Sequence, residues 1–133
     1  MLTDKIAELK GKTTSNRVLP GPTGNVIESS YTGFGKLLGI EVRDLGRHTT
    51  TLRSDGTLVG EGYGVYMGKS GEHADWTGHG VGLMQKDGSI EWRGQFIIST
   101  TSEPWKGLNQ FPCTLEVRVD SEGNHVGSLR QLK

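Results

Sequence analysis

The stretch that decides the fold is ADWTGHGVGLMQKDGSIEWRGQFII, residues 74–98, in which Asp87-Gly88 separates two extended segments. An Asp-Gly pair between extended runs is a strong hairpin signal, because a two-residue type I′ turn needs positive φ at both of its positions. The pair predicts that Lys86 lies opposite Ser89. One face of this hairpin is then clearly the more apolar, and we place it inside the protein. That face carries His79, Val81, Leu83, Trp92, Phe96 and Ile98.

Similar turn signals recur along the rest of the chain. Asp55-Gly56 predicts a second hairpin, and further turns are expected around Lys69 and over residues 120–124. No long helix is available to cover a sheet, so we expect the sheet to close on itself. The predicted fold is all-β: one closed antiparallel up-and-down β-barrel of about eight strands that occupies residues 1–133 as one domain. The expected strands cover residues 26–32, 37–42, 49–54, 57–66, 74–86, 89–100, 114–119 and 125–132.

Residues 1–11 are the exception to the strand pattern. Thr3 near the start, Lys10 in the last turn and Gly11 just beyond it fit a short N-terminal helix. A helix of about two turns is not stable alone. We therefore expect Ile6 and Leu9 to dock on one end of the barrel, on its sheet or on a second subunit.

The one long connection, residues 101–112, has an apolar side formed by Trp105, Leu108 and Phe111. A loop of this length with three large apolar residues is expected to fold over the end of the barrel. It would act either as a packed plug or as a lid over a cavity mouth.

Composition excludes several classes of protein. The chain of 133 residues carries 15 Lys plus Arg and 15 Asp plus Glu, which argues against a nucleic-acid-binding tail. Its apolar runs are too short for a transmembrane span, and we see no signal peptide at the N-terminus. The single Cys113 excludes an internal disulfide framework and is more typical of a small buried residue than of a nucleophile. A reducing, cytoplasmic setting is the default expectation.

The register across the turn at Lys69 determines the candidate site. An odd number of residues in that turn places Glu61 beside His79, whereas an even number separates them. We favour the odd case, in which the odd-numbered side chains from Val59 to Leu83 line the interior. Glu61 and His79 would then be candidate catalytic residues, a general base and a general acid in a poorly hydrated cavity. The simpler interpretation is that the pair is only hydrogen-bonded or points outward, and a third possibility is that it contacts a ligand.

The sequence predicts no cofactor and no metal, but it does predict further side chains that contact a ligand in the interior. No cofactor is expected, since Gly68-Lys69-Ser70 lacks the earlier glycine of a phosphate-binding loop. No metal is expected either, because the four histidines are scattered and only His48 and His79 share the proposed face. The predicted ligand-binding residues are His48, Thr50, Tyr63, Asp75, Trp92, Phe96 and Trp105.

Alternating glycines follow two neighbouring segments, Gly60–Gly64 and Gly78–Gly82. Glycine permits the sharp coiling that a small barrel needs, and Trp76 and Tyr66 could cover these strips. Together with residues 87–94, these runs resemble small uncharacterised bacterial β-barrel proteins, whose barrels are similar to allene oxide cyclases and, more loosely, to lipocalins. The resemblance covers roughly residues 12–133. It implies an interior able to hold a small apolar molecule and carries over no catalytic residue.

The sequence therefore predicts a cytoplasmic barrel that binds a small, largely apolar ligand and has no nucleic-acid or membrane partner. One alternative is an isomerase, cyclase or hydrolase that uses Glu61 and His79. Another is a homo-oligomeric assembly or interaction module whose barrel is filled. The volume of the interior separates the first two functions from the third.

Overall fold

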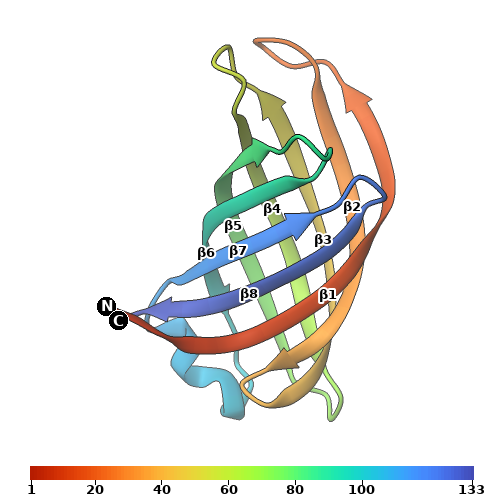
Figure 1. Ribbon diagram of the computed structural model, residues 1–133. Coiled ribbons are helices and arrows are strands. Elements are labelled where there is room, and N and C mark those ends of the chain that lie inside the picture. The colour runs from red at the N-terminus through yellow and green to blue at the C-terminus, as the bar shows by residue number, and fades with distance from the viewer.

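Eight antiparallel strands close into a barrel in the computed structural model, which describes residues 1–133 (Figure 1). Each strand pairs with its neighbours in the chain, and β1 pairs with β8 to complete the ring. The predicted closed up-and-down barrel is therefore confirmed. The elements are β1 (Leu2–Leu19), β2 (Val26–Leu37), β3 (Ile40–Leu52), β4 (Leu58–Gly68), β5 (His73–Met84), β6 (Ile90–Ser99), the 3₁₀ helix η1 (Glu103–Asn109), β7 (Cys113–Val119) and β8 (Asn124–Leu132).

The N-terminal segment is a strand, so the predicted helix over residues 1–11 is wrong. Two isolated helical turns would be marginal, whereas the same segment as β1 pairs with both β2 and β8 and closes the ring. Its side chains alternate accordingly. Ala7 and Leu9 are buried, and Glu8 and Lys10 between and beyond them are exposed.

The expected strands 37–42 and 49–54 belong mostly to one element, β3. The chain turns earlier than residue 40, at Leu38-Gly39, where φ is 49° and 80°. Positive φ at both positions is the type I′ geometry that joins two strands through two residues. The predicted break between residues 32 and 37 is wrong, since β2 runs without interruption to Leu37.

The two Asp-Gly turns are longer by one residue than predicted. The Gln85 N–H donates to the Ser89 carbonyl, so Lys86, Asp87 and Gly88 all lie in the turn. Gly88 has φ of 87°, whereas Asp87 stays at negative φ and its carboxylate accepts the Ser89 N–H at 2.9 Å. This is the three-residue loop that ends in a left-handed glycine. Arg53 and Thr57 bracket Asp55-Gly56 in the same way.

The longer turns reverse one face of the predicted interior. Glu61 lies beside His79 and Tyr63 beside Thr77, as predicted. Trp92, however, pairs with Gly82 and not with Leu83, so the even-numbered residues of β5 share the inner face with it. The prediction that odd-numbered side chains from Val59 to Leu83 line the interior is therefore wrong. Val81 and Leu83 are each 41% exposed on the outside.

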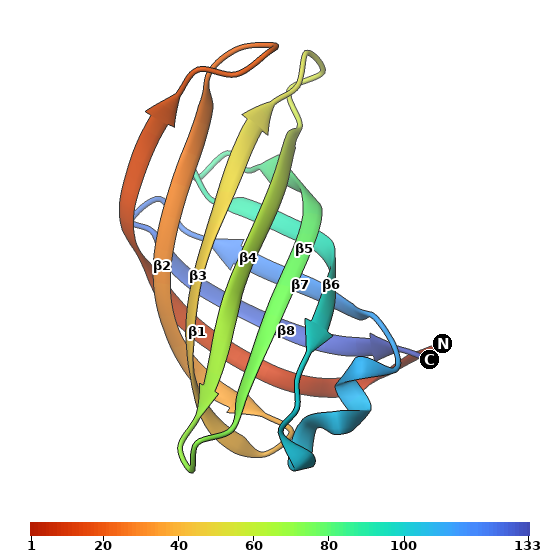
Figure 2. The same cartoon turned by 180° about the vertical axis from the view of Figure 1, so that it is seen from behind.

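The helix η1 lies at one end of the barrel (Figure 2). Trp105 and Leu108 are fully buried in the core, and the Trp105 Nε1–H donates to the Leu37 carbonyl at 3.3 Å. Asn109 exchanges hydrogen bonds with the backbone of Thr100, which fixes the loop at its base. The connection over residues 101–112 thus packs as a plug. None of the helical segments could span a lipid bilayer.

Candidate functional site: an aromatic cavity inside the barrel

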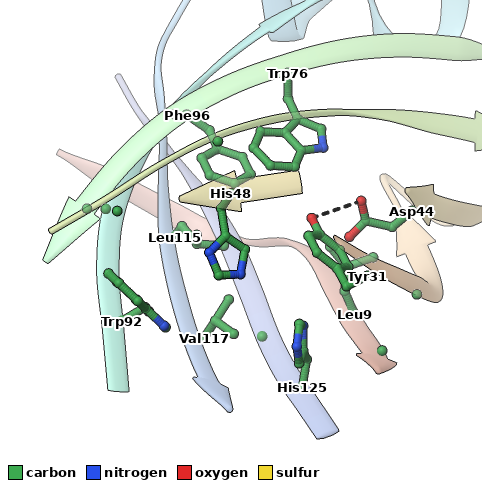
Figure 3. A pocket seen from close by; sticks show the side chains of 18 of the residues that line it. Leu9, Tyr31, Asp44, His48, Trp76, Trp92, Phe96, Leu115, Val117 and His125 are labelled. Atoms are coloured by element: carbon green, nitrogen blue, oxygen red, sulfur yellow. Dashed lines mark hydrogen bonds between the residues drawn. The ribbon is translucent and has the colours of Figure 1, made fainter. Parts of the chain in front are cut away.

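The barrel interior contains a cavity of about 110 Å³ (Figure 3). A cavity of about 150 Å³ can hold benzene. The cavity of this barrel is smaller, so it fits a few waters or a molecule no larger than benzene. Successive side chains of a strand point to opposite faces, so every second residue of each strand points into the barrel. The inward side chains that line it include Leu9 of β1, Tyr31 of β2, Asp44 and His48 of β3, Trp76 of β5, Trp92 and Phe96 of β6, Leu115 and Val117 of β7, and His125 of β8.

Glycines on the inner face make room for the large rings. A Cβ on Gly64 would lie 2.6 Å from Trp76 Nε1, and one on Gly46 would lie 2.7 Å from Cζ2 of the same indole. Trp92 packs in the same way against Gly60. The predicted cover of the glycine strips by Trp76 is therefore observed, but inside the barrel. Any larger residue at these positions would displace the aromatic lining.

Two of the rings form a stacked pair. The ring centroids of Trp76 and Phe96 are 4.3 Å apart, with 7° between their planes. Trp76 is only 3% exposed, and its Nε1–H has no hydrogen-bond partner. The pair joins the cavity to the core that packs on η1, because both residues belong to that core.

Asp44 is the one inward-facing carboxyl group of the cavity, and it is 5% exposed. The Tyr31 hydroxyl donates to its Oδ1 at 3.3 Å, and no Lys or Arg forms an ion pair with it (Figure 3). Burial raises the pKa of Asp44 to about 7, although the Tyr31 hydroxyl and the nearby Trp76 N–H both act to lower it. Burial, and then Asp44 itself, raise the pKa of Tyr31.

Two imidazoles border the cavity on either side of Tyr31. The ring centroid of Tyr31 lies 6.4 Å from that of His48 and 5.1 Å from that of His125. Burial lowers the pKa of His48. Burial, and then His48, lower the pKa of His125 to about 4, and its Nε2 shares a hydrogen bond of 2.8 Å with Thr13 Oγ1. Both imidazoles are therefore neutral near pH 7. No group of three His, Cys, Asp or Glu side chains is placed to hold a metal ion.

The predicted catalytic pair lies on the opposite surface of the sheet. Glu61 and His79 are adjacent, as predicted, but both are exposed on the outer face. Their predicted interior position is wrong, because the longer Asp-Gly turns shift the register by one residue. Both residues are on strands that form the wall of the cavity, but their side chains are exposed on the outside. The acid–base roles assigned to them stay a prediction.

The predicted ligand-binding residues divide between the two faces. His48, Trp92 and Phe96 line the cavity. Thr50 follows His48 on the inward face of β3 but does not line the cavity, and Trp105 belongs to the plug. The predicted interior positions of Tyr63 and Asp75 are wrong for the same reason of register. Tyr63 is 56% exposed and accepts a hydrogen bond from Arg47, and Asp75 is exposed as well.

Among the lining residues that the sequence reasoning missed are Tyr31, Asp44, Trp76 and His125. A signal for Asp44 existed in the alternation of Val42, Asp44 and His48 along one face of β3. The sequence analysis did not use this signal, because it divided β3 into two strands, 37–42 and 49–54. The alternation of one face cannot be followed across the residues between them.

Comparisons with known proteins support the fold. No protein-family model matches the sequence, and no curated protein matches it. The chain is similar to a conserved protein of unknown function from Rhodopseudomonas palustris (TM-score 0.83, 12% identity, 98% of this chain and 97% of that chain covered). It is also similar to a protein of unknown function from Clostridium acetobutylicum (TM-score 0.85, 10% identity, 100% of both chains). A third similar structure is a β-barrel-like protein from Acinetobacter baumannii (TM-score 0.84, 12% identity, 100% of this chain and 96% of that chain). Likeness at this level of identity extends to the small β-barrel and no further.

Proposed function

We propose that the protein binds a small, largely apolar molecule inside its barrel. The observation that carries the proposal is the cavity of about 110 Å³, with a wall made chiefly of aromatic rings, aliphatic side chains and glycines. A few polar groups, Asp44, Tyr31 and the two histidines, would orient the ligand, which is the usual composition of a small-molecule site. The earlier resemblance to allene oxide cyclase-like and lipocalin-like barrels, which implies such an interior, agrees with this proposal.

The expected localisation, partners and oligomeric state of the protein are compatible with a ligand inside the barrel. A cytoplasmic setting is supported by the single free thiol, Cys113, which is buried. The balanced charge supports a ligand that is neither nucleic acid nor a membrane surface. A homo-oligomer would be compatible with a site formed by one barrel, but the site does not require one.

A second candidate function is acid–base catalysis on the bound molecule. The observation in its favour is Asp44, because a carboxyl with a pKa of about 7 can take up and release a proton near neutral pH. Tyr31 would position the Asp44 carboxyl through its hydrogen bond and would itself keep its proton, because burial and Asp44 raise its pKa. This alternative moves the predicted acid–base roles from Glu61 and His79 to two residues that border the cavity. The alternative of a filled barrel has no comparable support, since the interior contains unoccupied volume.

The test is native mass spectrometry combined with a cavity-filling variant. Protein purified without denaturation should retain a small molecule, or should take one up from a library of neutral and charged fragments. Val117→Phe places a ring in the cavity and should abolish uptake. The matched control, Val126→Phe, adds the same ring on the outer surface of β8, where Val126 is 58% exposed, and should leave uptake unchanged. Equal uptake by both variants, or none by the wild type, would overturn the proposal.

A further inference from the structure

We propose that the cavity selects a small organic cation, with the Asp44 carboxylate as its counter-ion and the aromatic rings as its walls. This inference rests on the proposed ligand-binding function and names the chemical class of the ligand. It follows from what surrounds Asp44 and from what is missing around it.

Asp44 is a buried acid without a basic partner. Buried charges in proteins are normally paired or bound to metal, because an isolated charge is costly to remove from water. The only hydrogen bond that its carboxylate accepts comes from the neutral Tyr31 hydroxyl. The Trp76 N–H lies close enough to help lower the pKa of Asp44, so two neutral donors favour the anion without cancelling its charge. The arrangement leaves one negative charge for a ligand to neutralise.

No cationic side chain shares the cavity with Asp44. Lys10 and Arg93 are on the strands that form the wall, but both are exposed on the outside. The two imidazoles of the cavity, His48 and His125, have lowered pKa values and are neutral near pH 7. The other inward-facing titratable groups of the cavity are the Tyr31 and Tyr66 phenols, and burial raises the pKa of each. The ionised carboxylate would therefore be the only charge inside.

The aromatic lining favours a cation over an anion. One edge of the Trp76 indole, from Nε1 through Cε2 to Cζ2, packs against Gly64 and Gly46, and one edge of Trp92 packs against Gly60. Ring edges carry the positive end of the aromatic quadrupole, and ring faces carry the negative end. One face of Trp76 is covered by the stacked Phe96 ring, so the interior is left with the outer faces of this stacked pair and the faces of Trp92. Such faces attract ammonium and guanidinium groups, most strongly when water is excluded.

Size and donor chemistry narrow the class further. The cavity of about 110 Å³ is smaller than the cavity of about 150 Å³ that holds benzene, so the cationic group has about five or six heavy atoms. A metal cation is disfavoured, because no three His, Cys, Asp or Glu side chains converge. An alkylammonium or methylated ammonium group fits both limits.

Two probes of matched shape test the inference: tetramethylammonium and its neutral counterpart tert-butanol. Binding is followed in ¹H–¹⁵N spectra through the three indole N–H signals. Trp76 and Trp92 border the cavity, whereas Trp105 is in the plug and serves as an internal control. At about pH 8 we expect tetramethylammonium to bind at least tenfold more tightly than tert-butanol and to shift the first two signals only. Its affinity should fall on acidification through about pH 7, by up to tenfold per pH unit, because the carboxylate becomes protonated.

Asp44→Asn removes the charge with little change in shape and should weaken tetramethylammonium binding at least tenfold while tert-butanol binding persists. Asp75→Asn, which removes an exposed carboxylate on the outer face of β5, should change neither affinity. If Asp44→Asn fails to fold, the pH dependence of the wild type decides the matter alone. Preference for tert-butanol, or a cation affinity indifferent to pH, would overturn the inference and leave the proposed function intact. Failure of both probes would overturn the inference, and fragment uptake in the Val117→Phe comparison would then decide the proposed function separately.

Discussion

The two ends of the barrel interior are formed by the same eight strands but filled in different ways. Near η1 the interior holds apolar side chains that are at most 1% exposed: Leu37, Cys113 and Leu129 of the strands, and Trp105 and Leu108 of η1 itself. In the other half, glycines alternate with a few aromatic and polar residues, and a cavity remains. The comparison shows that barrel closure does not itself create a binding site. The site depends on which inward positions carry no side chain.

The difference has an energetic side. Packed apolar side chains stabilise the filled end through burial and dispersion contacts. The hollow half lacks part of these contacts and also contains Asp44, which is unfavourable when ionised. We therefore expect the filled end to contribute most of the free energy of unfolding. The hollow half contributes less, but it contains the cavity and Asp44.

The largest expected effect is at the plug. Trp105→Ala should lower the free energy of unfolding by about 3–5 kcal/mol, because it removes a fully buried indole and its hydrogen bond to Leu37. Trp92→Ala should cost less, since Trp92 borders a cavity and is only partly buried. Urea unfolding of both variants measures the contrast. Equal losses would show that the two ends do not differ in their contribution.

The next effect concerns pH and Asp44. Its folded-state pKa of about 7 lies above the ordinary value of 3.8, so its contribution to stability is complete below about pH 4 and is lost as the pH rises through 7. At 1.36 kcal/mol per unit, the loss amounts to at most about 4 kcal/mol. Asp44→Asn should therefore gain stability relative to the wild type between pH 5 and pH 8, as measured by urea unfolding at both values. The lowered pKa values of His48 and His125 affect the wild type and the variant alike. If the free energy of unfolding changes equally with pH in both proteins, Asp44 is not desolvated.

A smaller effect is expected from the glycine wall. Gly78→Ala would drive a Cβ into the Phe96 ring and should cost about 1–3 kcal/mol, as overpacking does. Gly107→Ala in η1 is the matched control, because a Cβ there meets nothing within 4 Å. Thermal unfolding compares the two variants. If both are tolerated, the rings of the hollow half can move freely and the cavity has no fixed shape.

The smallest effect is expected on the outer face. Glu61→Gln and His79→Gln replace exposed side chains and should each change stability by less than about 0.5 kcal/mol. Neither variant should alter uptake of a ligand by the cavity. Loss of uptake in either one would restore the pair as a functional site and contradict the assignment of function to the interior.

The architecture was predictable because its signals are local. Glycine-containing turns, short connections and the absence of a long amphipathic helix together favour a meander that closes. The inner face was not predictable from Asp87-Gly88, since the same dipeptide fits a two-residue and a three-residue turn, and one residue of register exchanges the faces. Residues 1–11 were misread because their partners on β8 lie at the other end of the chain, beyond any local pattern.

The candidate site was predicted in part for the same reason. Trp92 and Phe96 are large and apolar, so hydrophobicity alone placed them inside. Asp44 and Tyr31 offered no such cue, because a carboxyl and a phenol are usually found at the surface. Only their alternation with buried neighbours reveals them, and that requires the correct bounds of β2 and β3.

The pairing of β1 with β8 has a consequence for how the protein acquires its site. Every other interface joins strands that are adjacent in the chain, whereas here Arg130 donates to the Thr3 carbonyl from 127 positions away. Bringing such distant segments together costs chain entropy before any contact compensates for it. Until β1 pairs with β8, the ring of strands around the cavity is incomplete. The protein should therefore retain a ligand only after β1 has paired with β8, so ligand retention reports on this step of folding.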